Sequence, residues 1–497
     1  MSEAINIVWF KRDLRLRDHA PLRAALAEGL PVLLLYVFEP SVQQYPDWNA
    51  RHWQFVRQSL DDLNRQLEAH QTQVYALHSE ADEVFAFLSE QFAIQQVFSH
   101  EETGTRVTYD RDLRMQAFFE SKGIIWQEFQ ANGVRRAIKN RRSWNRQRNE
   151  VMLAPQETPD WSQFVPVRLE VPPAFFPEYR TAKLLNTYPD VYQPAGETYA
   201  WRYLRSFLGE RITGYMKNIS KPETSRKFCS RLSVYIAWGN LSIRQITQQM
   251  IRDTPEAFSQ WNGKNFNSRL HWRCHFVQKF EMEDRMEFEH LNRGYQALEQ
   301  PRNEAYIKAW KTGKTGFPLV DACMRAVTAT GYLNFRMRAM LVSFLTHHLW
   351  QDWRTGVHHL AQQFLDYEPG IHYPQFQMQA SVTGINTIRT YNPVKQSWQN
   401  DPEGVFIRKW VPELCHLPLR FLHEPWAMTA MDEALYHLRL GKDYPRPIID
   451  LEATTRHAQE QLWAFRKRPE VKAEAERILE RHVARPRPRK PKVLENS

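Results

Sequence analysis

The first 130 residues alternate between short apolar runs and amphipathic patterns of helical period. The apolar runs are INIVWF (5–10), PVLLLYVF (31–38), QVYALH (73–78), IQQVFSH (94–100) and GIIWQEF (123–129), and helical patterns at 18–28, 52–70, 80–92 and 109–121 separate them. This alternation is typical of a parallel sheet covered by helices on both faces. We therefore predict a Rossmann-like α/β domain over residues 1–130. Such sheets bind ligands at the carboxyl ends of their strands, where Lys11 to Asp18 follow the first run.

The remaining chain divides by composition into three further parts. Residues 131–197 are Pro-rich and carry seven Arg/Lys between Arg135 and Arg148, which predicts an interdomain linker packed on the surface. The basic cluster is either a solvated face or a patch that contacts phosphates or the other domain. Helical periodicity dominates residues 198–465, so we predict an all-α domain there. Residues 466–497 are basic and broken by Pro, which predicts a disordered or loosely bound tail.

Composition and charge narrow the class of protein. No apolar run reaches membrane-spanning length, and MSEAINIVWFKRD has charges where a signal peptide needs apolar residues. The net charge of +10 gives a moderate preference for polyanions. The four cysteines, Cys229, Cys274, Cys323 and Cys415, include no close pair, so we expect free thiols and no metal site. We expect a soluble, cytoplasmic monomer.

The stretch from Gly331 to Asp401 is the centre of the predicted helical domain. Apolar residues recur at helical spacing over 332–350, interrupted by Arg336 and Arg338. Two residues are separated by roughly 200° on a helix, so the two arginines cannot share a face. One of them is expected to point inward toward an acid, either Asp366 or Glu368. Spacing alone leaves a purely structural buried ion pair as an equal alternative.

Two further segments have binding potential. Ser230 can cap a helix that begins near Arg231 and stops at Gly239, and its N-terminus would suit a diphosphate. A second helix over 268–286 places Trp272 beside a cation, which suits a flat ring or an unstacked base. The alternatives are an ordinary helix cap and an amphipathic helix with a buried Trp.

Together these segments resemble the photolyase/cryptochrome family of flavoproteins in order and spacing. The resemblance rests on IVWFKRDLRLRDHAPL near the N-terminus, SRLSVYIAWGNLS (230–242), WRCHF (272–276), KTGKTGFPLVDACMRAVTATGYLNFRMRAMLVSFL (311–345) and GVFIRKWVPEL (404–414). It spans residues 5–465 and is most specific in the C-terminal half. It implies an FAD folded into a U inside the all-α domain, and it leaves room for an antenna chromophore of unknown identity in the N-terminal domain.

The resemblance also implies roles for individual residues. Arg338 would pair with Asp366 beside the isoalloxazine ring, and Glu368 would accept hydrogen bonds from the flavin pyrimidine edge. A positive charge there stabilises an anionic reduced flavin, the electron donor of the reaction. The cofactor-binding residues that the resemblance implies are Tyr215, Cys229, Ser230, Arg231, Leu232, Ser233, Arg269, Trp272, Arg273, Phe276, Phe335, Arg338, Asp366, Tyr367, Glu368 and His372.

Several positions depart from the common family pattern. His372 stands where relatives carry Asn, Asp or Cys facing the flavin N5, and Arg269 stands where pyrimidine-dimer enzymes have a Glu that contacts the lesion. Phe376 replaces the first Trp of the usual electron relay, whereas the second, Trp353, is retained. DYEPGIHYPQFQMQ resembles the bacterial iron–sulfur branch, but the close cysteine pair of that branch is missing.

The resemblance therefore predicts a light-driven, FAD-dependent photolyase acting on pyrimidine lesions in UV-damaged DNA. Its predicted catalytic residues are Trp272, His372, Arg338 and Asp366, and Arg269 and Trp272 are the predicted DNA contacts. A cryptochrome-like photoreceptor and an inactive DNA-binding flavoprotein are the alternatives.

The class of lesion depends on a proton donor, because a (6-4) photoproduct needs a group transferred between rings. His271, His275 and His372 are candidate donors, which favours (6-4) repair over cyclobutane-dimer repair by a small margin. Phe335, at the usual histidine position of (6-4) enzymes, argues the other way.

Overall fold

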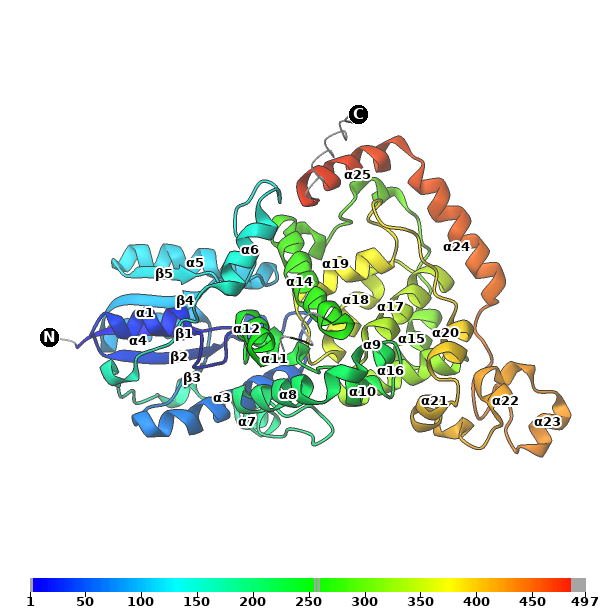
Figure 1. Ribbon diagram of the computed structural model, residues 1–497, viewed down its shortest axis with the longest axis horizontal. Coiled ribbons are helices and arrows are strands. Elements are labelled where there is room, and N and C mark those ends of the chain that lie inside the picture. The colour runs from blue at the N-terminus through cyan, green and yellow to red at the C-terminus, as the bar shows by residue number, and fades with distance from the viewer. Residues whose placement is uncertain (1–2, 254–255, 257–259, 484–497) are drawn as a thin grey trace, which may run out of the picture.

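The computed structural model describes residues 3–253, 256 and 260–483. Its N-terminal part holds a five-stranded parallel sheet in the order β3-β2-β1-β4-β5 (Figure 1). The strands are β1 Ala4–Phe10, β2 Val32–Phe38, β3 Tyr75–His78, β4 Ala93–His100 and β5 Ile125–Phe129. In the central register Val8 pairs with Leu34 on one side and with Phe98 on the other. All five predicted apolar runs form strands, which confirms the α/β fold class of this part.

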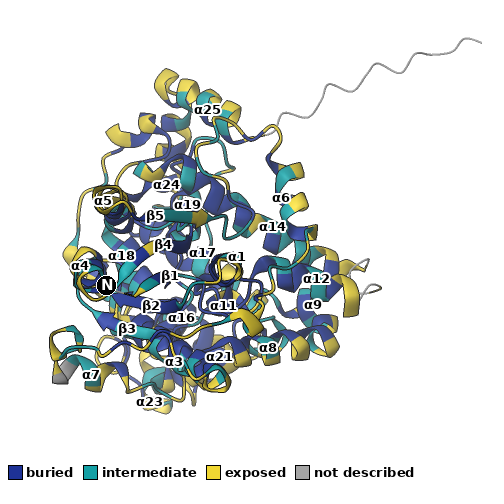
Figure 2. Cartoon of the chain, turned by 90° about the vertical axis from the view of Figure 1, so that its left-hand side faces the viewer, coloured by how far each residue is buried: buried dark blue, intermediate teal, exposed yellow. Residues whose placement is uncertain are grey.

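Alternate residues of the central strands supply two separate hydrophobic cores. Ile7 and Trp9 pack with α4 and α5, whereas Val8 and Phe10 pack with α1 and α3. These helices are α1 Ala20–Ala27, α3 Ala50–Leu67, α4 Ala81–Gln91 and α5 Arg106–Lys122. The central strands β1 and β2 are accordingly dark blue in Figure 2, between helices whose outer sides are yellow. The core under α1 and α3 continues into the core of the helical part, so that one face of the sheet joins the two halves.

Among the described residues of the C-terminal half, helices are the only regular elements, joined by irregular loops and accompanied by an isolated bridge between Leu440 and Tyr444. Its longer helices are α8 Glu197–Gly209, α12 Ile243–Asp253, α14 Trp261–Met282, α15 Glu304–Thr312, α16 Pro318–Thr330, α17 Phe335–Ser343, α18 Arg354–Gln363, α19 Pro369–Gln379, α20 Pro393–Asn400, α24 Leu451–Arg466 and α25 Pro469–His482. A π-helical turn, Phe344–His348, extends α17, so the predicted 332–350 helix is present but ends irregularly. In the predicted linker, α6 (Trp144–Leu153) and α7 (Tyr179–Leu185) interrupt an irregular chain. None of the described helices is both long and apolar enough to cross a membrane.

Arginines of the N-terminal part bind backbone carbonyls of the helical part. Arg12 donates from Nη2 to the carbonyl of Tyr367 at 2.6 Å and from Nε to the carbonyl of Ala237 at 3.0 Å. Gly239 is required beside this contact, because its φ is +72° and a Cβ there would lie 2.2 Å from the carbonyl oxygen of Arg12. Arg12, directly after the first strand, therefore holds the sheet against the helical part.

Asp13, His19 and His100 form a buried cluster at the carboxyl edge of the sheet. They are the one group of neighbouring metal-ligating side chains found among the described residues. Asp13 Oδ2 lies 2.9 Å from His19 Nε2 and 2.6 Å from His100 Nδ1. Zn–N and Zn–O bonds of about 2.0 Å in a tetrahedral site hold their ligand atoms more than about 3 Å apart. The spacing is therefore that of hydrogen bonds, which tie β1 to α1 and β4.

The C-terminal segment differs from the prediction. In Figure 1, α24 and α25 run along the outer edge of the helical part in red. Val471 and Ile478 of α25 are buried in the shared core, and Arg477 Nη1 lies 2.6 Å from Glu283 Oε1. The predicted loose tail over 466–497 is therefore wrong for 469–482, because these two apolar residues give the helix a packing face despite the basic composition. Residues 484–497 lie outside the described residues.

The carboxylate of Glu283 is expected to hold α25 in place in a pH-dependent way. Burial alone would raise the pKa of Glu283, but hydrogen bonds from His482 and Arg477 outweigh burial and lower it to about 2. A carboxyl pKa that is lower in the folded than in the unfolded protein stabilises the fold above the unfolded value. That contribution is lost as the pH falls through the folded value. A depression of about two pKa units corresponds to about 3 kcal/mol.

We expect Glu283→Gln to increase hydrogen exchange of the α25 amides strongly at pH 7. The difference from wild type should shrink as the pH falls from about 4.5 toward 2. Glu476→Gln, at an exposed position of α25, is the matched control and should leave exchange unchanged. An effect of Glu283→Gln that is equal at pH 7 and near pH 2 would contradict the assignment.

Candidate functional site

A cavity in the helical part brings together six of the predicted cofactor-binding residues. Helices α17 and α19, the end of α18 and the loop between α18 and α19 form its walls. The lining residues are Phe335, Arg338, Ala339, Val342, Leu360, Phe364, Asp366, Tyr367, Glu368, Ile371, His372, Gln375, Phe376 and Gln379. The lining thus combines apolar and aromatic side chains with the two predicted acids.

Arg338 is the inward arginine. Its Nη2 lies 2.8 Å from Asp366 Oδ2, its Nε donates to the carbonyl of Leu333 at 2.7 Å, and its guanidinium covers the ring of Phe364 at 3.9 Å. Arg336 is exposed, with Nε 3.4 Å from Ser220 Oγ. The predicted Arg338–Asp366 ion pair is present, and it forms part of the cavity wall.

A second ion pair orients Glu368. Arg273 on α14 donates from Nε to Glu368 Oε2 at 3.0 Å, and its Nη2 contacts the other carboxylate oxygen. Glu368 is the N-cap residue of α19 but accepts no capping hydrogen bond from that helix. The carboxylate is therefore held by α14 at the cavity edge and is not used by its own helix.

Trp272 and Arg269 form a stacked pair on the same helix, in which the indole is exposed and Arg269 is partly buried. The guanidinium of Arg269 lies 4.1 Å from the ring centroid of Trp272, and 44% of Trp272 is exposed. Arg269 also hydrogen-bonds the phenol of Tyr215, which packs on Phe266. The indole of Trp272 is therefore partly exposed on α14, one residue from Arg273. Phe276 of the same helix is instead buried against His275 and does not line the cavity.

The segment Cys229–Ser233 is not a capped helix start. Helix α11 begins only at Ser233, its N-cap is Leu232, and no side chain caps it. The predicted cap by Ser230 is therefore wrong, because Arg231 adopts a left-handed conformation with φ +59° that precedes the helix. Arg231 stacks its guanidinium 3.7 Å from the ring centroid of Tyr332, and burial raises the pKa of the Cys229 thiol to about 12. The segment presents an arginine and two serine hydroxyls without a classical cap.

The three candidate histidines are not placed as proton donors. His372 lines the cavity, but its Nε2 lies 2.9 Å from the carbonyl of Val357, so Nε2 carries the proton and donates it to that carbonyl. Burial lowers the pKa of His372 to about 4, which keeps its ring neutral at pH 7. His271 and His275 point to the side of α14 that faces Asn145 and Arg141. These two histidines therefore face the 141–145 segment.

Aromatic residues continue inward from the cavity. Phe376 lines it, and the ring centroid of Trp353 lies 6.5 Å from that of Phe376 and 6.3 Å from that of Tyr373. Trp353 is fully buried, and its Nε1 lies 3.2 Å from His290 Nδ1. Tyr367 also lines the cavity, but its phenol points away and donates to Asp47. No sequence pattern pointed to Asp47, which lies 320 residues from Tyr367 in the chain.

Buried polar atoms without a hydrogen-bond partner cluster around this region. They are Arg231 Nε, Arg269 Nε, Arg273 Nη1, Asn334 Oδ1, Asp366 Oδ1 and Gln375 Oε1. A buried polar group left without a partner costs about 1–3 kcal/mol, so such a set is typical of a site that a polar ligand completes. Donors and acceptors of both kinds beside aromatic side chains fit a flavin nucleotide. Arg338, Asp366 and Glu368 line the cavity that would hold its ring, whereas no residue of the 229–233 segment lines it.

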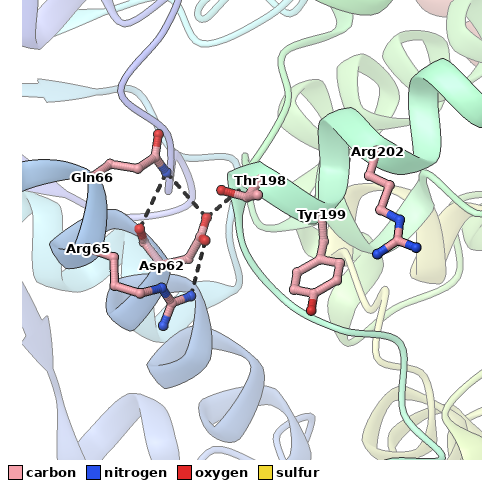
Figure 3. Close-up of a pocket in the computed structure, with 6 residues that line it drawn as sticks. All are labelled: Asp62, Arg65, Gln66, Thr198, Tyr199 and Arg202. Atoms are coloured by element: carbon pink, nitrogen blue, oxygen red, sulfur yellow. Dashed lines mark hydrogen bonds and ion pairs between the residues drawn. The ribbon is translucent and has the colours of Figure 1, made fainter.

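A separate hollow between α3 and α8 has a different character (Figure 3). It is lined by Asp62, Arg65, Gln66, Thr198, Tyr199 and Arg202. Asp62 accepts a hydrogen bond from the Thr198 amide at 3.0 Å and also contacts Arg65 and Gln66. A carboxylate of the chain thus already occupies the start of α8, and the hollow shares no residue with the cavity.

Comparisons with known proteins identify relatives over most of the chain. The family described as "FAD binding domain of DNA photolyase" matches residues 266–464, and the family described as "DNA photolyase" matches residues 6–139. The chain is 27% identical to a deoxyribodipyrimidine photo-lyase of Alkalihalophilus pseudofirmus, over 90% of this chain and 96% of the relative. It is also 27% identical to a cryptochrome DASH of Synechocystis, over 89% and 95%. A class III photolyase structure from Agrobacterium tumefaciens superposes with a TM-score of 0.81 at 24% identity, over 94% of this chain and 99% of that one.

Proposed function

Because the chain belongs to the photolyase/cryptochrome family and has an FAD-binding domain of the photolyase type, we propose that it is a light-driven photolyase of UV-damaged DNA. The observation that carries the proposal is the stacked Trp272–Arg269 pair on α14, whose indole is partly exposed and lies next in sequence to Arg273, the partner of Glu368. A photoreceptor has no need for a partly exposed indole beside its flavin site. An enzyme that takes a base out of the duplex uses such a platform to stack it.

The residues of the site would have different roles in the proposed reaction. A bound FAD supplies, once reduced, a light-excited electron donor. Arg338 places a fixed positive charge at the cavity wall, where it would stabilise negative charge on the ring. Asp366 Oδ1 and Glu368 offer acceptor oxygens for ring N–H groups, and Arg273 holds Glu368 in place. Trp272 and Arg269 would stack on and orient the flipped pyrimidines. The bond between the two pyrimidines breaks after they take up an electron, and the electron then returns.

We propose cyclobutane pyrimidine dimers as the lesion. Dimer splitting needs an electron but no proton donor, and none of the three candidate histidines is placed to donate. The sequence-based preference for (6-4) photoproducts rested on those histidines and on Arg269 in place of a lesion-contacting Glu, and the placement of the histidines removes the first of these two grounds. The relatives named deoxyribodipyrimidine photo-lyase support the same choice.

The test uses two matched oligonucleotides, one carrying a cyclobutane dimer and the other a (6-4) photoproduct. Chemically reduced protein is illuminated with each, and the restored bases are counted. We expect repair of the dimer alone, and His372→Ala should leave the product unchanged. Repair of the (6-4) product would show that a proton donor exists that the free protein does not display.

The second candidate function is light signalling, which the equal similarity to a cryptochrome DASH favours. Uptake of FAD together with a failure to restore either lesion would select it.

Trp272→Ala is expected to weaken binding of lesion DNA by about five- to 150-fold, because stacking of a base on an aromatic ring contributes about 1–3 kcal/mol. Binding of undamaged DNA should change little, since it depends on phosphate contacts. Trp261→Ala is the matched control, because Trp261 is an exposed indole at the other end of α14. Equal losses on damaged and undamaged DNA would assign Trp272 to folding.

A further inference from the structure

Asp47 is a buried carboxylate that lies between two phenols and a histidine. It precedes α3 in the N-terminal part, whereas its partners come from the helical part. The phenol of Tyr373 lies 3.0 Å from Oδ1 and 2.9 Å from Oδ2, and the phenol of Tyr367 donates to Oδ2. His358 Nε2 lies 3.4 Å from Oδ1, and 46% of the His358 side chain is exposed. A continuous chain of proton-carrying groups therefore runs from the phenols to solvent.

The phenol end of this chain touches the aromatic residues behind the cavity. The ring of Tyr373 meets Trp353 edge-on at 6.3 Å, whereas the ring contacts of Tyr367 are with Trp48, His52 and His372. Tyr373 is thus the phenol that can exchange an electron with Trp353.

A positive charge cannot remain on Trp353 at low cost. The indole is fully buried, and its hydrogen-bond partner His290 is neutral, because burial lowers the pKa of His290 to about 3. The guanidinium of Arg354 lies 5.0 Å from the indole centroid and disfavours a second positive charge. A phenol differs because it can release its proton on oxidation and become neutral, which avoids a buried unpaired charge.

We propose that Tyr373, Asp47 and His358 form a proton-coupled electron relay that reduces the bound flavin, a role that rests on the proposed function. Trp353 gives one electron across Phe376 to the light-excited oxidised flavin. Tyr373 then gives one electron to the oxidised indole and its phenolic proton to Asp47. The carboxylic acid so formed passes the proton to His358, whose imidazolium releases it to water. An external thiolate supplies the electron that restores Tyr373, while a proton returns along the same groups.

The surroundings of Asp47 suit a proton acceptor. Burial raises the pKa of Asp47, although the phenols and His358 act in the opposite direction, so the carboxylate is a stronger base than an exposed one. Tyr45 and Glu287 also face it. Tyr45 donates its phenol to Glu287, and burial raises the pKa of Glu287 to about 7. A second carboxyl group nearby makes a proton on Asp47 less costly.

The relay is tested on the oxidised FAD-loaded protein, illuminated with a dithiol. Flavin reduction is followed together with the optical and electron-spin signal of a neutral tyrosyl radical. We expect Tyr373→Phe to abolish that signal and to slow photoreduction at least tenfold. Asp47→Asn keeps the shape and Tyr373 but cannot accept a proton, so it should have the same effect. Wild type should slow at least twofold in D2O, and Asp47→Asn should not.

Controls separate the relay from folding and from repair. Tyr295→Phe removes another fully buried phenol and should behave as wild type. His358→Gln changes a half-exposed side chain that folding tolerates, and it should shorten the lifetime of the tyrosyl radical several-fold. Flavin content, and repair by chemically reduced protein, should stay normal in all variants.

Each remaining outcome decides between the two proposals. A tyrosyl signal and an isotope effect that survive in both Asp47→Asn and His358→Gln would overturn the relay. A normal relay without repair of either lesion would overturn the proposed function and leave the relay standing. Wild-type protein that takes up no FAD would overturn both.

Discussion

Arg338→Leu is expected to lose most of its bound flavin and about 3 kcal/mol of stability in the flavin-free protein. The substitution leaves Asp366 buried, with Oδ2 newly unpaired beside Oδ1, which already lacks a partner. Removing one member of a buried ion pair costs about 3–5 kcal/mol. We expect the lower end because about a quarter of the Arg338 side chain is exposed. Flavin absorbance per chain and urea unfolding measure the two effects.

Arg336→Leu is the matched control, because it removes a guanidinium from the exposed face of the same helix. It should change neither flavin content nor stability by a measurable amount. The double substitution Arg338→Leu, Asp366→Asn should recover much of the lost stability, since no unpaired charge remains, but not the flavin. Full flavin content in Arg338→Leu would show that the ion pair is structural, the alternative that spacing alone leaves open.

The sheet could be predicted from the sequence because each of its strands is marked by a short apolar run. Each apolar run has a length and a flanking helix that only a parallel α/β arrangement accommodates, and all five became strands. That one arginine points inward could also be predicted locally, because helical geometry places Arg336 and Arg338 on different faces of the helix. The identity of its partner, Asp366, came from the family resemblance, and the structure places the two together.

The errors arose where tertiary contacts override local patterns. Ser230 is a good cap residue, but the left-handed conformation of Arg231, whose guanidinium stacks on Tyr332, delays the helix. His271 and His275 have the spacing of neighbours of Trp272, yet α14 turns them toward Arg141 and Asn145. Basic, Pro-broken composition concealed the packing face of α25.

Asp47 shows a different limit. Nothing near it in sequence distinguishes it from a surface aspartate after a short helix, and its partners, Tyr367, Tyr373 and His358, are more than 300 residues away. A carboxylate shared between two domains becomes visible only when the domains are assembled. For the aromatic relay, the sequence analysis identified Trp353 and showed that Phe376 replaces a Trp. It identified no acceptor for the proton.

Asp321→Ala is expected to be among the most destabilising single substitutions in the chain, at about 4 kcal/mol. Asp321 is fully buried in the first turn of α16, and its carboxylate accepts four hydrogen bonds. They come from the Thr315 amide at 2.8 Å, the Thr315 hydroxyl at 2.7 Å, the Gly316 amide at 3.1 Å and the Tyr444 phenol at 2.6 Å. Each buried donor left without an acceptor costs about 1–3 kcal/mol, and the relief from burying a carboxylate offsets part of the sum.

The loss should reach the flavin cavity, because α16 packs against α17, the helix that carries Arg338. Tyr444→Phe removes one of the four donors and should cost about 1 kcal/mol. Its smaller cost would show that the loss of stability scales with the number of hydrogen bonds removed. Asp110→Ala, at an exposed position of α5, is the control and should stay within about 0.5 kcal/mol of wild type. Urea unfolding of the flavin-free proteins measures all three. A cost below about 1 kcal/mol for Asp321→Ala would mean that water replaces the carboxylate and that the turn before α16 does not depend on it.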